Sequence, residues 1–166
     1  MLITPAYERL NKRLYDVEPE YGTSGKTWAK YVRKCAQDNP GSILDYGCGR
    51  RTLEQELGYP IQNYDPAIPG YDAPPEPAHC VACTDVLEHI EPECLDAVLD
   101  DLKRVTQAVG FFVIATRPAA KVLADGRNAH LINRPIEWWL PQIWERFTIS
   151  QVTNLGILFI VIVKAK

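Results

Sequence analysis

The sequence has no long apolar run, no surplus of basic residues and no recognisable leader segment. Its longest apolar run, Ile157 to Val163, is far shorter than the roughly 20 residues that cross a bilayer. The first ten residues contain Pro5, Glu8 and Arg9, whereas a signal peptide needs an apolar run there. The formal net charge is -3 at pH 7, which disfavours a broad basic face for nucleic acid. These absences argue against a membrane span, secretion and nucleic-acid binding, and they predict a cytoplasmic protein.

The cysteines do not form a recognisable disulfide or metal pattern. There are five, an odd number. Cys80 and Cys83 have the spacing of half a zinc site, but no second Cys/His pair follows at zinc-ribbon distance. They also lie in a strand-like run, where residues three apart point to opposite faces. Most of the cysteines are therefore expected to be reduced core thiols, and no metal site is predicted.

The remaining composition is ordinary for a globular domain. Of 166 residues, 46% are apolar and 23% are charged, which suits one compact domain with its own core. Residues 1–166 are expected to form a single domain, with helices in residues 1–40 and an alternating core in residues 41–166. No internal repeat is visible.

Helix and strand signals alternate along the core. Helices are expected from Pro5, from a Ser24 cap to Asn39, over residues 52–57, 92–105 and 136–147, and strands over 43–46, 61–64, 80–83, 111–115, 148–152 and 157–163. Pro141 should kink or split the last helix, and the tryptophans at helical spacing there (138, 139 and 144) are interpreted as core. Alternation of this kind predicts a mostly parallel sheet covered by helices on both faces, with an antiparallel C-terminal strand pair.

Candidate ligand-binding residues follow the first strands, because ligands of such sheets bind at the carboxyl ends of the strands. Gly47 and Gly49 permit a tight turn and a close approach of a ligand. A dinucleotide site would have a third glycine, and it would not place an acid such as Asp45 beside an anionic pyrophosphate. A nicotinamide-dependent enzyme is therefore disfavoured, and Asp45 suits a cationic ligand.

A resemblance to a known family rests on three segments in order: Ile43 to Gly49, the strand-ending acid Asp65, and Cys83 to Ile90. Together they resemble class I S-adenosylmethionine-dependent methyltransferases, especially the branch that acts on small molecules. The resemblance implies a Rossmann-like, doubly wound fold and S-adenosyl-L-methionine as the cofactor. It places the Asp45 acid near the amino acid part of the cofactor and the Asp65 acid on both ribose hydroxyls. The implied cofactor-binding residues are Asp45, Tyr46, Gly47, Cys48, Gly49, Asp65, Pro66, Thr84, Asp85 and Val86.

The chain departs from that family in three places. Arg50 and Arg51 stand where a small residue is usual, and they could crowd or recharge the carboxylate end of the cofactor. Residues 65–77 are rich in proline and glycine and predict a loop in place of a helix and a strand, so Gly70 to Asp72 is the expected wall of the adenine pocket. Ala78 and His79 replace an acid that usually precedes the next strand.

The acceptor side is predicted from the long polar connection between residues 117 and 134. His130 begins a pattern, followed by Asn133, Pro135 and two tryptophans, that resembles methyltransferases found near glycan-building enzymes. A histidine there is either a general base or a loop histidine that bonds the backbone, and the sequence leaves both readings open. The expected acceptor-binding residues are Arg117, Asp125, Arg127 and Asn128, since the connection emerges at the cofactor's edge of the sheet.

Two functions remain in competition. The first is an enzyme that methylates an oxygen or nitrogen of a small-molecule or glycan-like acceptor. The second is an inactive, cofactor-binding partner subunit whose exposed Trp138 and Trp139, together with the Pro-rich loop, contact a catalytic chain. The pair Glu88 and His89 is interpreted as fixed geometry at a helix entrance rather than as acid/base machinery. Nucleobase methylation is disfavoured, because neither an Asn/Asp-Pro-Pro-aromatic run nor a Pro-Cys dipeptide occurs.

Overall fold

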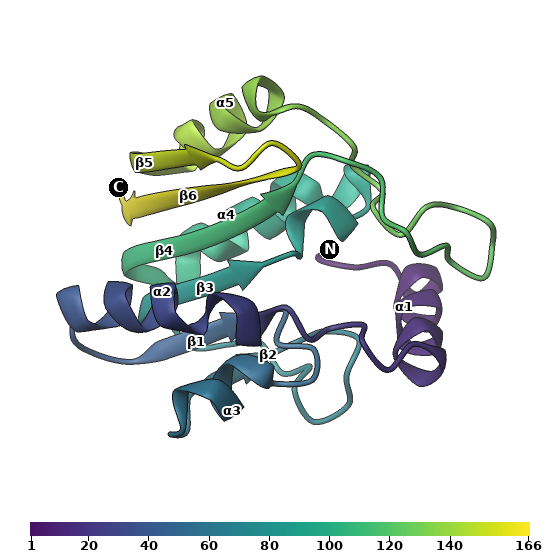
Figure 1. Ribbon diagram of the computed structural model, residues 1–166, viewed down its shortest axis with the longest axis horizontal. Helices are drawn as coiled ribbons and strands as arrows, with labels where there is room; N and C mark the ends of the chain where they lie inside the picture. Colours follow the sequence, from purple (N-terminus) through teal and green to yellow (C-terminus); the bar gives the residue numbers. More distant parts are fainter.

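The computed structural model describes residues 1–166 and places one six-stranded sheet between helices (Figure 1). The strands are β1 (Ile43–Tyr46), β2 (Gln62–Tyr64), β3 (Ala78–Thr84), β4 (Thr106–Ala115), β5 (Phe147–Asn154) and β6 (Leu158–Ala165). Their order is β2-β1-β3-β4-β6-β5; the first four are parallel, and β6 runs antiparallel to both β4 and β5. The predicted Rossmann-like sheet with its antiparallel C-terminal pair is confirmed.

The helices are α1 (Pro5–Val17), α2 (Gly25–Asp38), α3 (Thr52–Leu57), α4 (Leu95–Val105) and α5 (Ile136–Arg146), with short 3-10 turns at Leu87–His89 and Pro92–Cys94. None of them combines the length and apolar character that crossing a membrane requires. Residues 65–77 contain neither helix nor strand, so the predicted shortening of the core is confirmed.

Two apolar layers hold the helices against the sheet. Trp28 and Val32 of α2 pack with Leu53 of α3 on one face, and α4 and α5 cover the other. Cys80 belongs to the first layer and Cys83 to the second, which confirms that these two thiols point to opposite faces. The sheet is therefore buried on both sides, as its nearly continuous apolar strands require.

Helix α1 covers the carboxyl edge of the sheet rather than a face. Its buried Tyr7 and Leu14 pack with Leu123 and Ala129 of the connection between β4 and α5, and the two segments lie side by side in Figure 1. Thr4 caps the helix, since its hydroxyl accepts the Tyr7 N–H at 3.2 Å. The packing of α1 closes over the ends of the parallel strands, where ligands bind in this fold.

Two local predictions, a cap and a strand boundary, were wrong. Ser24 does not cap α2: its backbone is helical rather than extended, and its hydroxyl instead lies 3.1 Å from the Thr84 carbonyl oxygen. Strand β4 begins at Thr106 instead of residue 111, because its first residues pair with β3 although Gln107 is exposed.

Helix α5 also differs from its prediction. Pro141 does not split it, and the fully buried Trp139 and Ile143 hold the helix against the core on either side of the proline. Only Trp139 of the three tryptophans is core, whereas Trp138 is 37% and Trp144 57% exposed. A helix presents a single stripe to the core, and only Trp139 shares that stripe with Ile143.

Candidate functional site

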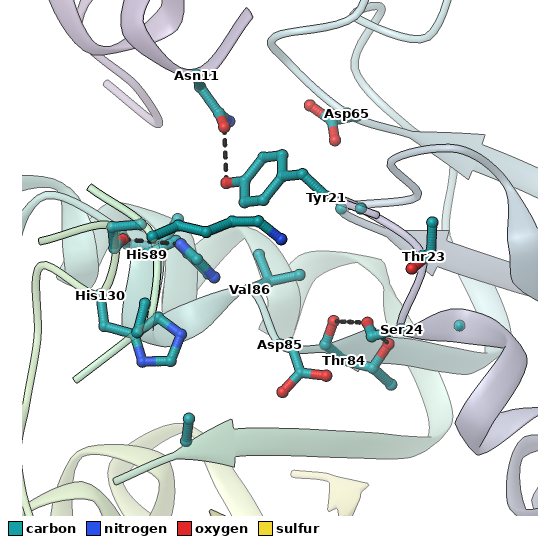
Figure 2. Close-up of a pocket in the computed structure, with 18 of the residues that line it drawn as sticks. Asn11, Tyr21, Thr23, Ser24, Asp65, Thr84, Asp85, Val86, His89 and His130 are labelled. Atoms are coloured by element: carbon teal, nitrogen blue, oxygen red, sulfur yellow. Dashed lines mark hydrogen bonds between the residues drawn. The ribbon is translucent and has the colours of Figure 1, made fainter. Parts of the chain in front are cut away.

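A cavity of about 400 Å³ opens at the carboxyl edge of the sheet, between the strand ends, α1 and the connection after β4. Figure 2 shows side chains from all of these segments facing one space. The predicted site residues that line it are Asp45, Gly47, Cys48, Asp65, Pro66, Thr84, Asp85, Val86, Arg117 and His130. The alternation of strands and helices thus brings together side chains from four strand ends.

The turn after β1 needs glycine at its first position. Gly47 has a φ of +82°, and its N–H donates to the Tyr64 carbonyl at 2.7 Å. A Cβ built on Gly47 would lie only 2.4 Å from a methyl carbon of Val86. Only glycine fits at this position, because any side chain would overlap Val86.

Asp65 ends β2 and is held by three donors. Its Oδ1 accepts the Ala67 N–H at 3.0 Å, and its Oδ2 accepts the Gly49 N–H at 3.2 Å and the Tyr15 hydroxyl at 2.9 Å. Burial raises the pKa of this carboxyl, against these hydrogen bonds that lower it. Asp65 is thus a fixed acceptor, and the Tyr15 hydroxyl of α1 can be exchanged for another donor.

Asp45 is a second acid of the cavity, with a strongly raised pKa. It is buried at the end of β1, and burial together with the nearby Asp65 and Glu54 raises its pKa to about 7. Asp85 adds a third acid, in a left-handed backbone conformation with φ of +54° and with a pKa also raised by burial. Two buried carboxyls and the half-buried Asp85 around one cavity favour a ligand that carries positive charge.

Two predicted cofactor residues do not line the cavity. The hydroxyl of Tyr46 donates to Asp101 at 2.9 Å, because alternation along β1 turns that side chain toward α4. Gly49 packs against Gly22, where a Cβ would lie 2.6 Å from the Gly22 carbonyl oxygen, and it contributes its N–H to Asp65. Both residues support the site from behind.

The two arginines after the glycine turn point away from the cavity. Arg50 donates to the carbonyls of Tyr15 at 2.6 Å and Tyr21 at 3.0 Å, and so fastens the segment after α1 to the glycine turn. Arg51 stacks over the ring of Tyr71, with its guanidinium carbon 5.1 Å from the ring centroid. Neither crowds the cavity, and residues 70–72 do not line it, so their predicted contact with adenine stays a prediction.

His130 has a defined tautomer. Its Nδ1 lies 2.6 Å from the Arg117 carbonyl oxygen, which can only accept, so Nδ1 carries the hydrogen and Nε2 keeps a free lone pair. Both residues line the cavity. The hydrogen bond to the backbone is therefore compatible with a role as a base, because it orients the free Nε2.

The other predicted acceptor residues lie elsewhere in the connection. Arg127 and Asp125 form an exposed ion pair at 2.8 Å. The amide of Asn128 bonds the backbone of Ala119 in both directions, at 2.9 and 2.8 Å, and accepts the His130 N–H at 2.9 Å. None of the three lines the cavity. Asn128 shapes the loop that carries His130, and direct acceptor contact by these residues stays a prediction.

Sequence reasoning missed the contribution of the N-terminal segment and of His89. Tyr21 donates to Asn11 at 2.7 Å, and its ring meets the ring of His89 edge-on (Figure 2). The stretch from Glu18 to Gly25, with its tyrosine, threonine and serine immediately before a helix, was the available signal. Burial lowers the pKa of His89 to about 3, helped by the charge of His130, so the ring is neutral.

A family model described as a methyltransferase domain matches residues 21–155. No curated protein sequence matches the chain.

Solved structures share its fold at low sequence identity. The 1,6-didemethyltoxoflavin-N1-methyltransferase of Burkholderia thailandensis, with bound 1,6-didemethyltoxoflavin and S-adenosylhomocysteine, is 14% identical with a TM-score of 0.70, over 100% of this chain and 92% of that one. The magnesium protoporphyrin IX methyltransferase of Synechocystis PCC 6803, with bound S-adenosylhomocysteine, is 14% identical with a TM-score of 0.62, over 87% of this chain and 84% of that one. The N-methyltransferase NodS of Bradyrhizobium japonicum WM9, also with S-adenosylhomocysteine, is 11% identical with a TM-score of 0.61, over 95% of this chain and 97% of that one. The family match runs from the turn before α2 to the loop before β6, and the chain therefore belongs to the methyltransferase-domain family.

Proposed function

We propose that this chain, as a single domain of residues 1–166, transfers a methyl group from S-adenosylmethionine to an oxygen or nitrogen of a small-molecule or glycan-like acceptor. The observation that carries the proposal is the buried carboxylate of Asp65 beside the glycine turn, in one cavity with Asp45. The family match and the S-adenosylhomocysteine bound in three neighbours support the same cofactor.

The residues present fit this cofactor. Asp65 can accept two ribose hydroxyls once the Tyr15 hydroxyl leaves, because a carboxylate offers about four acceptor positions. Asp45 offers a carboxylate for the amino group, and Gly47 presents bare backbone to the same cavity, because Val86 occupies the place that a Cβ would take. When bound, the cofactor supplies an activated methyl group on a positively charged sulfur, which suits a cavity lined by acids.

The acceptor end is assigned to Arg117 and His130. His130 presents its free Nε2 to the cavity and would take the proton of the attacking group, while the Arg117 carbonyl holds the ring in place. Asp125, Arg127 and Asn128 are retained as acceptor-binding candidates on the same connection, which would reach the acceptor by closing over it. Positioning of the two reactants would supply most of the rate.

Two further observations bear on the setting. All five cysteines are unpaired thiols, and four are buried, which supports a reducing, cytoplasmic compartment.

The alternative of an inactive partner subunit relied on Trp138 and Trp139 as one exposed surface, but Trp139 is fully buried. The two tryptophans therefore do not form the joint exposed surface that this alternative expects.

A calorimetric titration with S-adenosylhomocysteine and, separately, NAD tests the cofactor assignment. We expect the wild-type chain to bind S-adenosylhomocysteine and not NAD, and Asp65→Ala to weaken that binding at least roughly tenfold, through loss of charged hydrogen bonds. Asp38→Ala removes an exposed acid and is the matched control. Binding that is equal in the two variants, or a preference for NAD, would reject the proposal.

The base assignment is tested separately on the methyl acceptor. His130→Ala should lower turnover roughly 100-fold, because general-base catalysis contributes at that scale, and should leave the affinity for S-adenosylhomocysteine nearly unchanged. Unchanged turnover would remove His130 from the mechanism and leave the cofactor assignment intact.

A further inference from the structure

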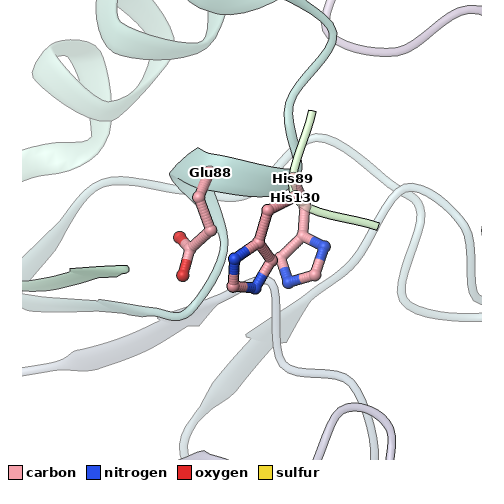
Figure 3. A group of neighbouring side chains, drawn as sticks. All are labelled: Glu88, His89 and His130. Carbon is pink, nitrogen blue, oxygen red and sulfur yellow. The ribbon is translucent and has the colours of Figure 1, made fainter. Parts of the chain in front are cut away.

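His89 and His130 line the acceptor end of the cavity with the fully buried Glu88 beside them, an arrangement that a proton-transfer role for His130 does not explain. We propose that Glu88, His89 and His130 bind a divalent first-row transition-metal cation there. One ligand atom of each residue lies within 4.8 Å of the others, and Figure 3 shows the three side chains close together, with Glu88 and His89 on the 3-10 turn Leu87–His89.

Both histidines are oriented as metal ligands are. Nδ1 of His89 lies 2.8 Å from the Ala129 carbonyl oxygen, as Nδ1 of His130 does from that of Arg117 at 2.6 Å. Since a carbonyl only accepts, each Nδ1 carries the hydrogen, and each Nε2 presents a lone pair. A backbone bond that fixes the tautomer in this way is the usual outer shell of a metal-binding histidine. The rings also meet edge to face, with centroids 4.7 Å apart.

Glu88 supplies an independent observation. Its Oε1 accepts the Ala115 N–H at 3.0 Å, but its Oε2 is buried and has no hydrogen-bond partner. An unpartnered buried carboxylate oxygen is costly, and such groups are rare in folded proteins. Burial and the neighbouring Asp85 raise the pKa of Glu88, and a cation beside the two imidazoles would replace the proton that they favour and satisfy this oxygen.

The donor set selects the class of cation. Two imidazole nitrogens and one carboxylate suit zinc, manganese, iron or cobalt, whereas magnesium and calcium prefer oxygen ligands throughout. Bonds of about 2.1 Å to one ion place the ligand atoms about 3 to 4 Å apart, so small side-chain rotations bring the three atoms into range. Three protein ligands leave at least one position open toward the cavity.

The role of the cation rests on the proposed function. At the open position it would hold an oxygen or nitrogen acceptor and lower the pKa of that group. In the loaded site His130 is a ligand, and it serves as the base only when no cation is bound. This is a site that neither the cysteine pattern nor the spacing of the histidines predicted.

Cobalt(II) is a suitable probe because its visible absorption reports the ligand set. Titration of the metal-free chain should give one bound equivalent without a thiolate-to-cobalt band. His130→Ala and Glu88→Gln should each weaken binding roughly tenfold or more. Glu88→Gln keeps an oxygen for the Ala115 N–H, and His130 lies on a loop, so at least one of the two variants will fold.

The third histidine of the chain provides the matched control. His79 lies at the start of β3 beside Ser42, outside the cavity, and His79→Ala should bind cobalt as the wild type does. Equal binding by wild type and His130→Ala, loss in His79→Ala, a thiolate band or no stoichiometric binding would overturn the proposal. S-adenosylhomocysteine affinity is measured on the same samples, so failure of the metal site and failure of the cofactor site are separate results.

Discussion

The carboxyl of Asp45 should lower the free energy of unfolding at neutral pH, and Asp45→Asn should restore it. Burial raises the pKa of this carboxyl to about 7 in the folded chain, against about 3.9 in an unfolded chain. The unfolded chain therefore gives up this proton above about pH 4, while the folded chain keeps it until about pH 7. Stability falls progressively over that interval, and the gap of about three pKa units corresponds to about 4 kcal/mol at and above pH 7.

The asparagine keeps the shape of the side chain and removes this titration. Urea unfolding should give a free energy of unfolding about 2 to 4 kcal/mol higher than wild type at pH 7.5, and a value within about 0.5 kcal/mol at pH 4. The same variant should bind S-adenosylhomocysteine more weakly, since its amino group loses a charged partner. Asp38→Asn, at an exposed position, should change neither quantity. A variant no more stable than wild type at pH 7.5, or one whose gain is larger at pH 4, would refute the reasoning.

The remaining predictions concern the turn, helix α1 and the core. Gly47→Ala, with its Cβ 2.4 Å from a valine methyl and a φ of +82°, should lower the free energy of unfolding by about 1 to 3 kcal/mol in urea and weaken S-adenosylhomocysteine binding; normal affinity would contradict the close approach. Tyr15→Phe frees the strand-ending carboxylate and should tighten that binding up to about tenfold by calorimetry, whereas Tyr21→Phe, whose hydroxyl bonds elsewhere, should not; equal effects would exclude competition. Trp139→Ala should cost about 3 to 5 kcal/mol in the same unfolding assay and Trp144→Ala less than about 1, and the reverse order would show that α5 is rotated.

The sequence predicts the parts of this fold whose signals are local. Helix α3 begins and ends where Thr52 and Gly58 indicate, because the left-handed Gly58 is a helix terminator that needs no tertiary partner. The positions of the acids at the ends of β1 and β2 could be predicted for the same reason, since the apolar residues of each strand show where it ends.

The parts that were missed depend on contacts between distant segments. Tyr15 reaches Asp65 only because α1 docks at the sheet edge, and no periodicity in α1 identifies that partner. Glu88 and His89 do form a fixed turn as predicted, but the orphaned oxygen and the nearby His130 ring become visible only in three dimensions. In α5, a one-residue offset decides that Trp139 is core and Trp138 is not.

The most direct test of the cofactor site is a crystal structure of the chain with S-adenosylhomocysteine. The account predicts both ribose hydroxyls on the Asp65 carboxylate, the Tyr15 hydroxyl displaced from it, and the amino group beside Asp45 in the cavity at the carboxyl edge of the sheet. A ligand bound away from these strand ends, or an Asp65 that keeps Tyr15 while the ribose lies elsewhere, would contradict it.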